Sequence, residues 1–320
     1  MSGAVPQVVT VGETMAALRA DGPIRLGGTM RLSVAGAESN VAIGLARLGH
    51  PVGWVGRVGD DEFGALVLRT LRAEQVDVGF ARVDRDGRPT GLLASETGAR
   101  DLVKVGYYRS GSAGSALTAQ DVLPALTPGV RVLHLTGITP ALSEEAADAV
   151  LAAAVRAGDL GITVCLDVNY RTRLWSVAEA RARLRPLVRR ADVLVASADE
   201  LPLVAGAPAL DEPEAVAELL TRGPGEVVVT RGAAGATLTT ADGTVDQPAR
   251  RVPVVDVVGA GDAFVAGYLS GLLDGLAPPA RLHRAATTAA FAVATPGDWE
   301  GLPTRRDLHL LDAPAGTTLR

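Results

Sequence analysis

The sequence predicts an α/β fold in which helices cover both faces of a mostly parallel sheet. From Val130 onward, short β-prone runs alternate with segments of helical spacing. Such alternation is typical of parallel sheets built from strand–helix–strand units. The chain has 320 residues, of which 48% are hydrophobic, and a mean hydropathy of +0.23, so it can bury a large core. This length fits a single domain over residues 1–320 better than two full domains.

The elements of this core can be placed in order along the chain. A β-prone run at 8–11 predicts the first strand. A helix is expected over 40–48, where apolar residues recur at helical spacing before Gly49 and Pro51 end it. The later elements are expected as strand 52–58, helix 61–73, strand 132–135, helix 143–157, strand 162–167, helix 177–190, strand 193–196, strand 227–230, and helices near 260–274, 279–295 and 304–311.

Two other segments, about 14–35 and 89–110, resemble short exposed strands joined by turns. They are far apart in the sequence, but they can pair into one small sheet beside the core. Neither has the helical spacing of the core elements. We therefore expect a small second sheet made from both segments.

Composition excludes several classes of protein. The net charge of −5 and the pI near 5.5 give no reason to expect nucleic acid or an anionic membrane as a partner. No apolar run approaches the roughly 18 residues of a membrane span, and the N-terminus lacks the pattern of a secretory signal. Cys165 is the only cysteine, which excludes an intrachain disulfide and a cysteine-cluster metal site. We expect a cytoplasmic protein.

Lysine is nearly absent, because Lys104 is the only one among 31 basic residues. The Walker phosphate-binding loop requires Gly-Lys-Ser/Thr, and this chain has no such string. Schiff-base catalysis would depend on Lys104 alone, in the exposed-looking segment 100–104. If the protein handles phosphate, backbone N–H groups, arginines and a metal ion must do so.

The segment from Val255 to Phe264 carries the strongest chemical signal. Gly259 and Gly261 allow a tight turn, so free N–H groups at the start of a helix can face an anion. Asp262 lies in the first helical turn, where the helix dipole favours a carboxylate, and we expect it to stay ionised. An anion site beside a fixed carboxylate suits phosphoryl transfer, in which the acid accepts a hydroxyl proton.

This segment has two other interpretations. An isolated glycine turn is often structural, with Asp262 acting only as a first-turn acid. A dinucleotide fingerprint needs a small residue where Phe264 stands, and it would place Asp262 beside a pyrophosphate that it repels. A dinucleotide site is therefore not expected.

The string Asp256–Asp262 resembles the C-terminal signature of the PfkB (ribokinase-like) sugar kinases, D-T-x-G-A-G-D, with Val257 in place of Thr. The resemblance implies a ribokinase-like three-layer α/β/α sandwich with a β lid built from the segments 14–35 and 89–110. It also implies ATP and Mg²⁺ as cofactors and leaves a requirement for K⁺ open. The resemblance further implies that Asp262 is the catalytic base and that the N–H groups of Gly259, Ala260 and Gly261 form the anion hole.

Gly36–Asn40 precedes a helix and resembles the N-terminal element of the same family, G-G-x-x-x-N. A helix cap by Ser39 or Asn40 explains the string equally well. The segment Gly59–Gly64, also usual in these kinases, adds weight to the functional interpretation. By the resemblance, Gly36 and Asn40 contact the sugar.

A second strand end is expected at the nucleotide. Thr230, Arg231, Gly232 and Gly235 follow the strand at 227–230 and correspond to the segment that lies against ATP phosphates in the family. An arginine suits phosphate in a chain without spare lysines. The alternative is an ordinary β-hairpin turn.

Ser197–Glu200 occupies the place of the family motif N-x-x-E, which is linked to magnesium and phosphate. Ser197 replaces the Asn of that motif, so the resemblance implies a role at the metal, and an indirect one, for Glu200 only. We still expect Ser197 to contribute to binding of the nucleotide. An acid at a helix N-terminus is the competing explanation for Glu200.

Two Tyr/Arg segments narrow the substrate. Tyr107 and Arg109 end a lid-like strand, while Arg171 follows the strand at 162–167, at the end of the sheet where open α/β folds bind ligands. A lone arginine is usually a solvated surface residue. Two Tyr/Arg pairs fit the recognition of a planar carboxylate by forked guanidinium donors better.

Within the PfkB family these strings, and Asp298 near the end, resemble the 2-keto-3-deoxygluconate kinases over essentially the whole chain. By that resemblance Tyr107, Arg109 and Arg171 hold the keto-acid end and Asp298 contacts a hydroxyl. Relatives often have a tyrosine near Leu92 or Leu93, so one substrate hydrogen bond is missing here.

The resemblance therefore implies MgATP-dependent phosphorylation of the 6-hydroxyl of 2-keto-3-deoxygluconate, and we expect a homo-oligomer that assembles through the lid. A fructokinase- or ribokinase-like enzyme for neutral sugars is the alternative within the family. A non-catalytic sugar-acid sensor is the alternative from another class, although binding alone would not need the base Asp262. The choice between the gluconate and galactonate epimers stays open.

Overall fold

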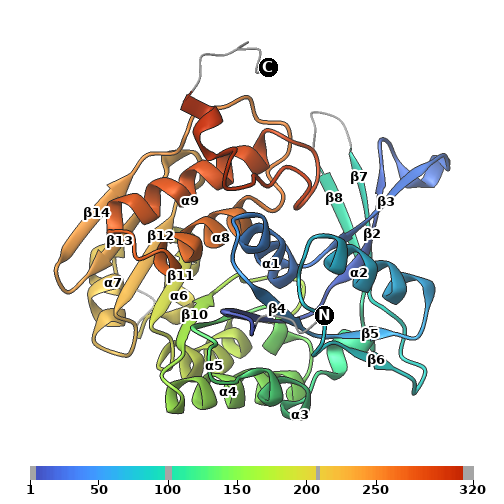
Figure 1. Cartoon of the computed structure of the whole chain (residues 1–320), viewed down its shortest axis with the longest axis horizontal. Coiled ribbons are helices and arrows are strands. Elements are labelled where there is room, and N and C mark those ends of the chain that lie inside the picture. The colour runs from blue at the N-terminus through green and yellow to red at the C-terminus, as the bar shows by residue number, and fades with distance from the viewer. Residues whose placement is uncertain (1–4, 98–102, 207–209, 313–320) are drawn as a thin grey trace.

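The computed structural model describes residues 5–97, 103–206 and 210–312. Within these residues the central sheet has eight strands (Figure 1). Six neighbouring strands run parallel, and an antiparallel hairpin extends one edge. In sheet order the strands are β14 (Gly243–Gln247), β13 (Ala236–Thr240), β12 (Glu226–Thr230), β11 (Val193–Ser197), β10 (Thr163–Asp167), β9 (Val132–Thr136), β1 (Val8–Val11) and β4 (Val52–Val55).

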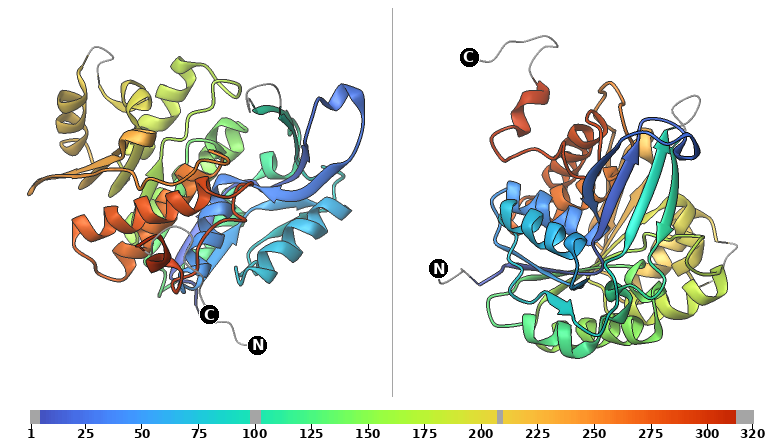
Figure 2. Two further views of the ribbon diagram at one scale, coloured as in Figure 1. Left: turned by 90° about the horizontal axis from the view of Figure 1, so that it is seen from above. Right: turned by 90° about the vertical axis from the view of Figure 1, so that its right-hand side faces the viewer.

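Helices pack on both faces of this sheet (Figures 1 and 2). One face is covered by α1, α8 and α9, and the other mainly by α3, α4 and α5. The helices are α1 (Ala37–Arg47), α2 (Glu62–Ala73), α3 (Ala119–Val122), α4 (Glu144–Asp159), α5 (Val177–Val188), α6 (Leu201–Val204), α7 (Glu212–Leu220), α8 (Ala260–Leu273) and α9 (Pro278–Val293). Among these helices none combines the length and the hydropathy that crossing a bilayer requires. The predicted three-layer α/β/α arrangement is confirmed.

Two hydrophobic clusters, one on each face, hold the layers together. The strands supply mostly Val and Leu, whereas α4 packs through a row of small residues that includes Ala146, Ala149 and Ala153. Small side chains let α4 lie close to the sheet, and α8 is buried over almost its whole length. The start of α8 is therefore held in a fixed position relative to the carboxyl ends of the parallel strands.

A second sheet of four strands stands at one side of the core, and we call it the lid sheet (Figure 2). Its order is β3 (Met30–Ala35), β2 (Met15–Ala20), β7 (Leu92–Thr97) and β8 (Val103–Tyr108). β2 pairs in parallel with β7, so the segments 14–35 and 89–110 form one sheet as expected. Residues 98–102, which fall within the second segment, lie outside the described residues.

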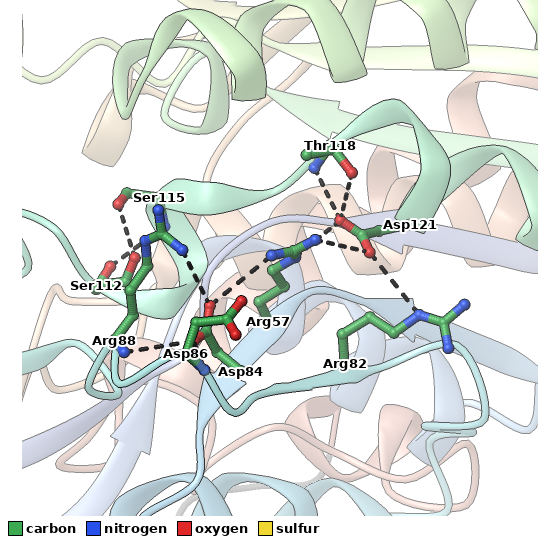
Figure 3. Close-up of polar contacts among 9 residues, drawn as sticks. All are labelled: Arg57, Arg82, Asp84, Asp86, Arg88, Ser112, Ser115, Thr118 and Asp121. Carbon is green, nitrogen blue, oxygen red and sulfur yellow. Dashed lines mark hydrogen bonds and ion pairs between the residues drawn. The ribbon is translucent and has the colours of Figure 1, made fainter.

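Charged side chains fix the base of the lid sheet to a two-stranded ribbon of β5 (Arg57–Gly59) and β6 (Arg82–Asp84) (Figure 3). Arg57 donates from Nε to Asp121 of α3 over 2.8 Å, and its Nη1 lies 3.8 Å from Asp84 within the ribbon. Arg88 contacts the same Asp84 at 3.5 Å, just before β7. The segment that leads into β7 and the helix α3, which follows β8 in the chain, are therefore both bound to the ribbon.

Two local predictions were wrong. The helix expected at 304–311 is replaced by a short 3₁₀ helix at Leu308–Asp312, because Asp307 accepts from the amide and hydroxyl of Thr304 (2.8 and 2.6 Å) and closes a turn. The strand expected at 52–58 divides into β4 and β5 at Gly56, where a Cβ would collide with the carbonyl oxygen of Gly12.

Candidate active site

A cavity of about 880 Å³ lies between the inner face of the lid sheet and the carboxyl ends of the central parallel strands, and we call it the cleft. Asn40 and Asp262 lie in its wall on the core side, and Tyr107 and Arg109 lie in its wall on the lid side. Arg171, which follows β10, also lines it. The structure therefore brings together residues that the sequence placed in separate motifs.

The turn before α8 presents unpaired backbone amides. Gly259 has φ +75°, and a Cβ there would collide with the carbonyl oxygen of Asp298, so the position requires glycine. Within the described part of the chain the amides of Gly259 and Gly261 make no hydrogen bond, and that of Ala260 makes only a long one of 3.4 Å. A Cβ at Gly261 would meet open space. The turn has the free donors and the room that an anion needs.

Asp262 is 8% exposed and accepts a hydrogen bond from Nδ2 of Asn40 over 2.7 Å. Burial raises the pKa of Asp262 to about 8, and the carboxylates of Asp167 and Asp298 act in the same direction, against Asn40 and Arg171. The expectation that the helix dipole keeps Asp262 ionised is therefore wrong for the free protein. A base whose pKa lies near neutrality is well suited to accept a proton.

The start of α1 holds Gly36 and Asn40 in the cleft. A Cβ at Gly36 would collide with the carbonyl oxygen of Glu13, so this glycine has a packing role. The capping alternative is not seen: Ser39 donates to the Gly36 carbonyl over 3.0 Å, and Asn40 bonds Asp262. Oδ1 of Asn40 is buried and has no partner among the described residues.

Arg109 is already engaged with a carboxylate of the protein. Its Nε donates to Oε2 of Glu13 over 2.6 Å, and the other Glu13 oxygen accepts from Ser112. Glu13 is buried, and the guanidinium of Arg109 stacks 5.8 Å from the ring centre of Tyr107. The charge of Arg109 is therefore largely compensated, although its remaining N–H groups can still donate.

Arg171 differs from Arg109. It is exposed at the cleft and forms no ion pair within the described residues. Its neighbour Arg173 donates from Nη1 to the carbonyl of Val105 in the lid sheet over 2.6 Å and also has no carboxylate partner there. Within the described residues this side of the cleft therefore carries two guanidinium groups that form no ion pair.

Asp298 is buried at the cleft, and its Oδ2 lies 2.9 Å from Nη2 of Arg19 in β2. Its Oδ1 has no hydrogen-bond partner among the described residues. An unsatisfied buried acceptor fits a hydroxyl donor of a ligand.

On the predicted nucleotide side, Thr230–Gly235 forms the turn between the antiparallel strands β12 and β13, as the hairpin alternative described. Gly232 and Gly235 have φ +53° and +97°. The guanidinium of Arg231 is bound to Glu212 and to Thr237, the latter over 2.7 Å, so it is not free for phosphate.

Ser197 and Glu200 begin a 3₁₀ turn after β11. The two Glu200 oxygens accept from the amides of Tyr170 (2.6 Å) and Ser197 (2.8 Å), which matches the helix-terminus explanation. Asp167 lies close by, and burial together with Glu200 raises the pKa of Asp167. In the described residues no group of three or more His, Cys, Asp or Glu side chains could hold a metal ion directly.

Sequence reasoning gave no role to three residues of the cleft region: Glu13, Arg19 and Asp167. Glu13 and Asp167 follow or end parallel strands, so the rule that ligands bind at the carboxyl ends of strands could have found them. Arg19 lies inside a short lid strand, and no local pattern distinguishes it from a surface arginine.

The comparisons with known proteins agree with this geometry. A family model described as pfkB family carbohydrate kinase matches residues 5–305. A 2-dehydro-3-deoxygluconokinase from Bacillus subtilis (strain 168) is 38% identical over 94% of this chain and 93% of the relative. A 2-dehydro-3-deoxygalactonokinase from Haloferax volcanii is 34% identical over 91% and 92%. A fructokinase from Klebsiella pneumoniae is 36% identical over 86% and 90%.

Solved structures share the same fold. A putative ribokinase II from E. coli in complex with ATP and Mg²⁺ superposes with a TM-score of 0.89 at 25% identity, covering 96% of this chain and 99% of that one. A PfkB protein from Polaromonas sp. JS666 has a TM-score of 0.84 at 34% identity, covering 95% and 99%. The three-layer sandwich with a β lid is thus the fold of these proteins as well.

Proposed function

Because this chain belongs to the pfkB family of carbohydrate kinases, we propose that it transfers the γ-phosphoryl group of ATP to the 6-hydroxyl of 2-keto-3-deoxy-D-gluconate, also called 2-dehydro-3-deoxygluconate. The product is 2-keto-3-deoxy-6-phosphogluconate. The relative from Bacillus subtilis that bears this activity in its name supports the substrate, as do the arginines of the cleft.

One observation carries the choice of an acidic substrate. Arg19 and Arg109 each face a carboxylate of the protein, whereas Arg171 has none within the described residues. A free guanidinium at the wall of a cleft suits one planar carboxylate. We propose that Arg171 provides the charge, while Arg109 and Tyr107 add hydrogen bonds to the keto-acid end.

The other end of the substrate would lie at α8. Asp262, aligned by Asn40, accepts the proton of the 6-hydroxyl as that oxygen attacks the γ-phosphorus. The amides of Gly259, Ala260 and Gly261 hold the charge that spreads over the phosphoryl oxygens. Gly36 packs against Glu13, and its lack of a side chain lets the sugar approach α1. Asp298 accepts a hydrogen bond from a substrate hydroxyl through Oδ1, which has no partner among the described residues.

The nucleotide would lie beyond the same turn, toward the β12–β13 connection. Thr230, Gly232 and Gly235 border this side, whereas Arg231 would have to leave Glu212 to reach a phosphate. Bound Mg²⁺ would neutralise charge on the phosphate oxygens. Glu200 would act on it only through water, since both its oxygens accept backbone amides. Ser197 contributes its amide to that arrangement, and a K⁺ requirement stays open.

We also propose that residues 1–320 form one kinase domain that assembles into a homo-oligomer through the lid sheet. Leu32 and Tyr108 are exposed on its strands, and Tyr108 is 69% exposed. Large apolar side chains left exposed on the strands of a small sheet favour an interface there. Sedimentation of the wild type beside Tyr108→Asp tests this, since a lid interface predicts a smaller species for the variant. A cytoplasmic location belongs to the same proposal, because the phosphoryl donor is ATP.

An ATP-coupled assay over a panel of sugars tests the proposed substrate. The panel contains 2-keto-3-deoxygluconate, its galactonate epimer, fructose and ribose. We expect the highest kcat/KM for 2-keto-3-deoxygluconate. Preference for the epimer would correct the stereochemistry alone, and preference for fructose or ribose would replace the sugar acid by a neutral sugar. No turnover with any sugar would favour a sugar-acid sensor, which equilibrium binding of the keto-acid would then reveal.

A further inference from the structure

Three consecutive residues of the loop after α9 each contact a strand of the lid sheet. The Asp298 carboxylate forms the ion pair with Arg19 of β2. Trp299 donates from Nε1 to the carbonyl of Val34 in β3 over 3.0 Å. Glu300 accepts from the hydroxyl of Ser33, also in β3, over 2.6 Å. The loop is therefore bound to two neighbouring strands of the lid sheet, β2 and β3.

The same loop is fixed to the start of α8. The carbonyl oxygen of Asp298 lies where a Cβ of Gly259 would be, so these two backbones are in direct contact. The amide of Gly297 donates to Asp256, whose other carboxylate oxygen accepts from Val258 (3.2 and 3.0 Å). A displacement of Asp298 would thus press on the turn that leads to Asp262.

Stability alone does not account for the ion pair between Arg19 and Asp298. The two side chains are only 14% and 5% exposed, and buried ion pairs are often no more stable than an apolar pair of the same volume. Nε of Arg19 and Oδ1 of Asp298 also have no hydrogen-bond partner among the described residues. The pair occupies the cleft wall, where the lid sheet and the catalytic turn meet.

We propose that Arg19 is a positioning residue for phosphoryl transfer: through Asp298 it connects the lid sheet to the turn that carries the Gly259 amide and Asp262. When the lid sheet is seated, Arg19 holds Asp298 against Gly259, and the anion-binding amides and the base are aligned together. When it is not, the turn loses this support and water can reach the γ-phosphate. The inference rests on the proposed transfer reaction but not on the identity of the sugar.

Arg19 also balances charge beside the base. Asp262 is surrounded by Asn40 from α1, by Asp167 and Arg171 from the end of β10 and the loop that follows, and by Asp298 from the loop after α9. Asp256 and Glu300 lie near Asp298 as well. Arg19 lowers the pKa of Asp298, which burial and the neighbouring carboxylates raise, and the charge of Asp298 in turn raises the pKa of Asp262. Loss of Arg19 should therefore move the acid limb of the kcat/KM profile, which loss of packing alone would not do.

The test compares Arg19→Gln and Arg19→Lys with Arg31→Gln. Arg31 is a matched control, because it lies in the adjacent strand β3 but forms an ion pair with Asp21 that is open to solvent. The assay uses the whole protein and the sugar that the wild type phosphorylates best, and it measures kcat, both KM values and the ratio of ADP to sugar phosphate. Thermal melting shows whether each variant is folded.

For Arg19→Gln we expect kcat to fall about tenfold or more, the loss typical of one charge-assisted hydrogen bond. The ratio of ADP to sugar phosphate should rise above one, and Arg19→Lys should recover part of both properties. Arg31→Gln should match the wild type. A wild-type kcat and ratio in both Arg19 variants would overturn the inference.

A double variant tests whether Arg19 acts through Asp298. Asp298→Asn combined with Arg19→Gln should be no slower than Asp298→Asn alone, because the second change then removes nothing further. Multiplying losses would overturn the proposed path. Since the assay uses the preferred sugar, a wild type that ignores 2-keto-3-deoxygluconate contradicts the proposed substrate while the role of Arg19 is still measured.

Discussion

The two walls of the cleft are built in different ways. The α8 wall comes from one continuous segment, 256–262, whose turn presents the unpaired backbone amides of Gly259 and Gly261, within the described residues, beside Asp262. The opposite wall is assembled from β2, β8 and the loops after β10 and α9, and two of its arginines, Arg19 and Arg109, pair with carboxylates from other elements. Backbone chemistry is local, whereas side-chain recognition depends on distant partners. Substitutions in the two walls should therefore have different effects on activity and on thermal stability.

The largest effect is expected at the base. Asp262→Asn keeps the shape of the side chain but removes the proton acceptor, so kcat should fall roughly 10²–10⁴-fold while the sugar KM changes only a few-fold. Steady-state kinetics on the preferred sugar measures this. A variant that keeps more than about a tenth of the wild-type kcat would contradict a general-base role for Asp262.

Two glycines of the same turn should separate folding from chemistry. Gly259→Ala places a side chain at φ +75° against Asp298, so Tm should fall, since a left-handed conformation alone costs about 1–2 kcal/mol. Gly261→Ala meets only open space, so Tm should hold. Its methyl group would nevertheless enter the proposed phosphate site, and we expect a loss of kcat of about 10²-fold, comparable to losing one anion-hole donor. Full activity of Gly261→Ala would place the phosphates elsewhere.

The arginines of the opposite wall should also differ from each other. Arg171→Ala removes an uncompensated charge, so kcat/KM for the sugar acid should fall roughly 10–200-fold, or about 1.5–3 kcal/mol, with Tm unchanged. The slow rate of this variant on fructose, which has no carboxylate, should hardly differ from that of the wild type. Arg109→Ala leaves Glu13 buried without its partner, which typically costs about 3–5 kcal/mol of stability.

The Arg109 variant should therefore lose thermal stability and activity on both substrates. The sequence alone treated the two arginines as equivalent members of a clamp, and Glu13 is the reason they are not. Equal, acid-selective losses in both variants, without a change in Tm, would restore the symmetrical clamp.

The pH dependence should report the buried base. With the pKa of Asp262 raised to about 8 in the free protein, kcat/KM should rise about tenfold per pH unit below that value and then level off. The unfolded carboxyl titrates near about 3.9, so this group contributes stability that is complete below that pH and is lost as the pH rises through about 8. Asp262→Asn should therefore melt at a higher temperature than the wild type at alkaline pH, and the difference should vanish in acid.

The features that could be predicted from the sequence are those that depend on local residues, and the features that could not be predicted depend on distant partners. The alternation of strands and helices gave the layers, and the glycine turn before Asp262 marked the anion-binding turn without any tertiary information. The raised pKa of Asp262 could not be predicted, because burial and the carboxylates of Asp167 and Asp298 outweigh the helix dipole. Nor could the pairing of Arg19, since its partner lies 279 positions away in a loop with no regular pattern.

The smallest effect is expected for the only lysine. The Lys104 side chain is 76% exposed at the edge of the lid sheet, and its ammonium group lies 3.7 Å from Glu96 in the neighbouring strand. Exposed pairs of this kind contribute at most about 1 kcal/mol, and the proposed phosphate site uses backbone amides in place of a lysine. Lys104→Ala should therefore keep the wild-type kcat, ATP KM and Tm in the coupled assay. Loss of activity in this variant would show that the lid wall, and not the α8 wall, supplies the group that acts on phosphate, and the comparison between the two walls would be reversed.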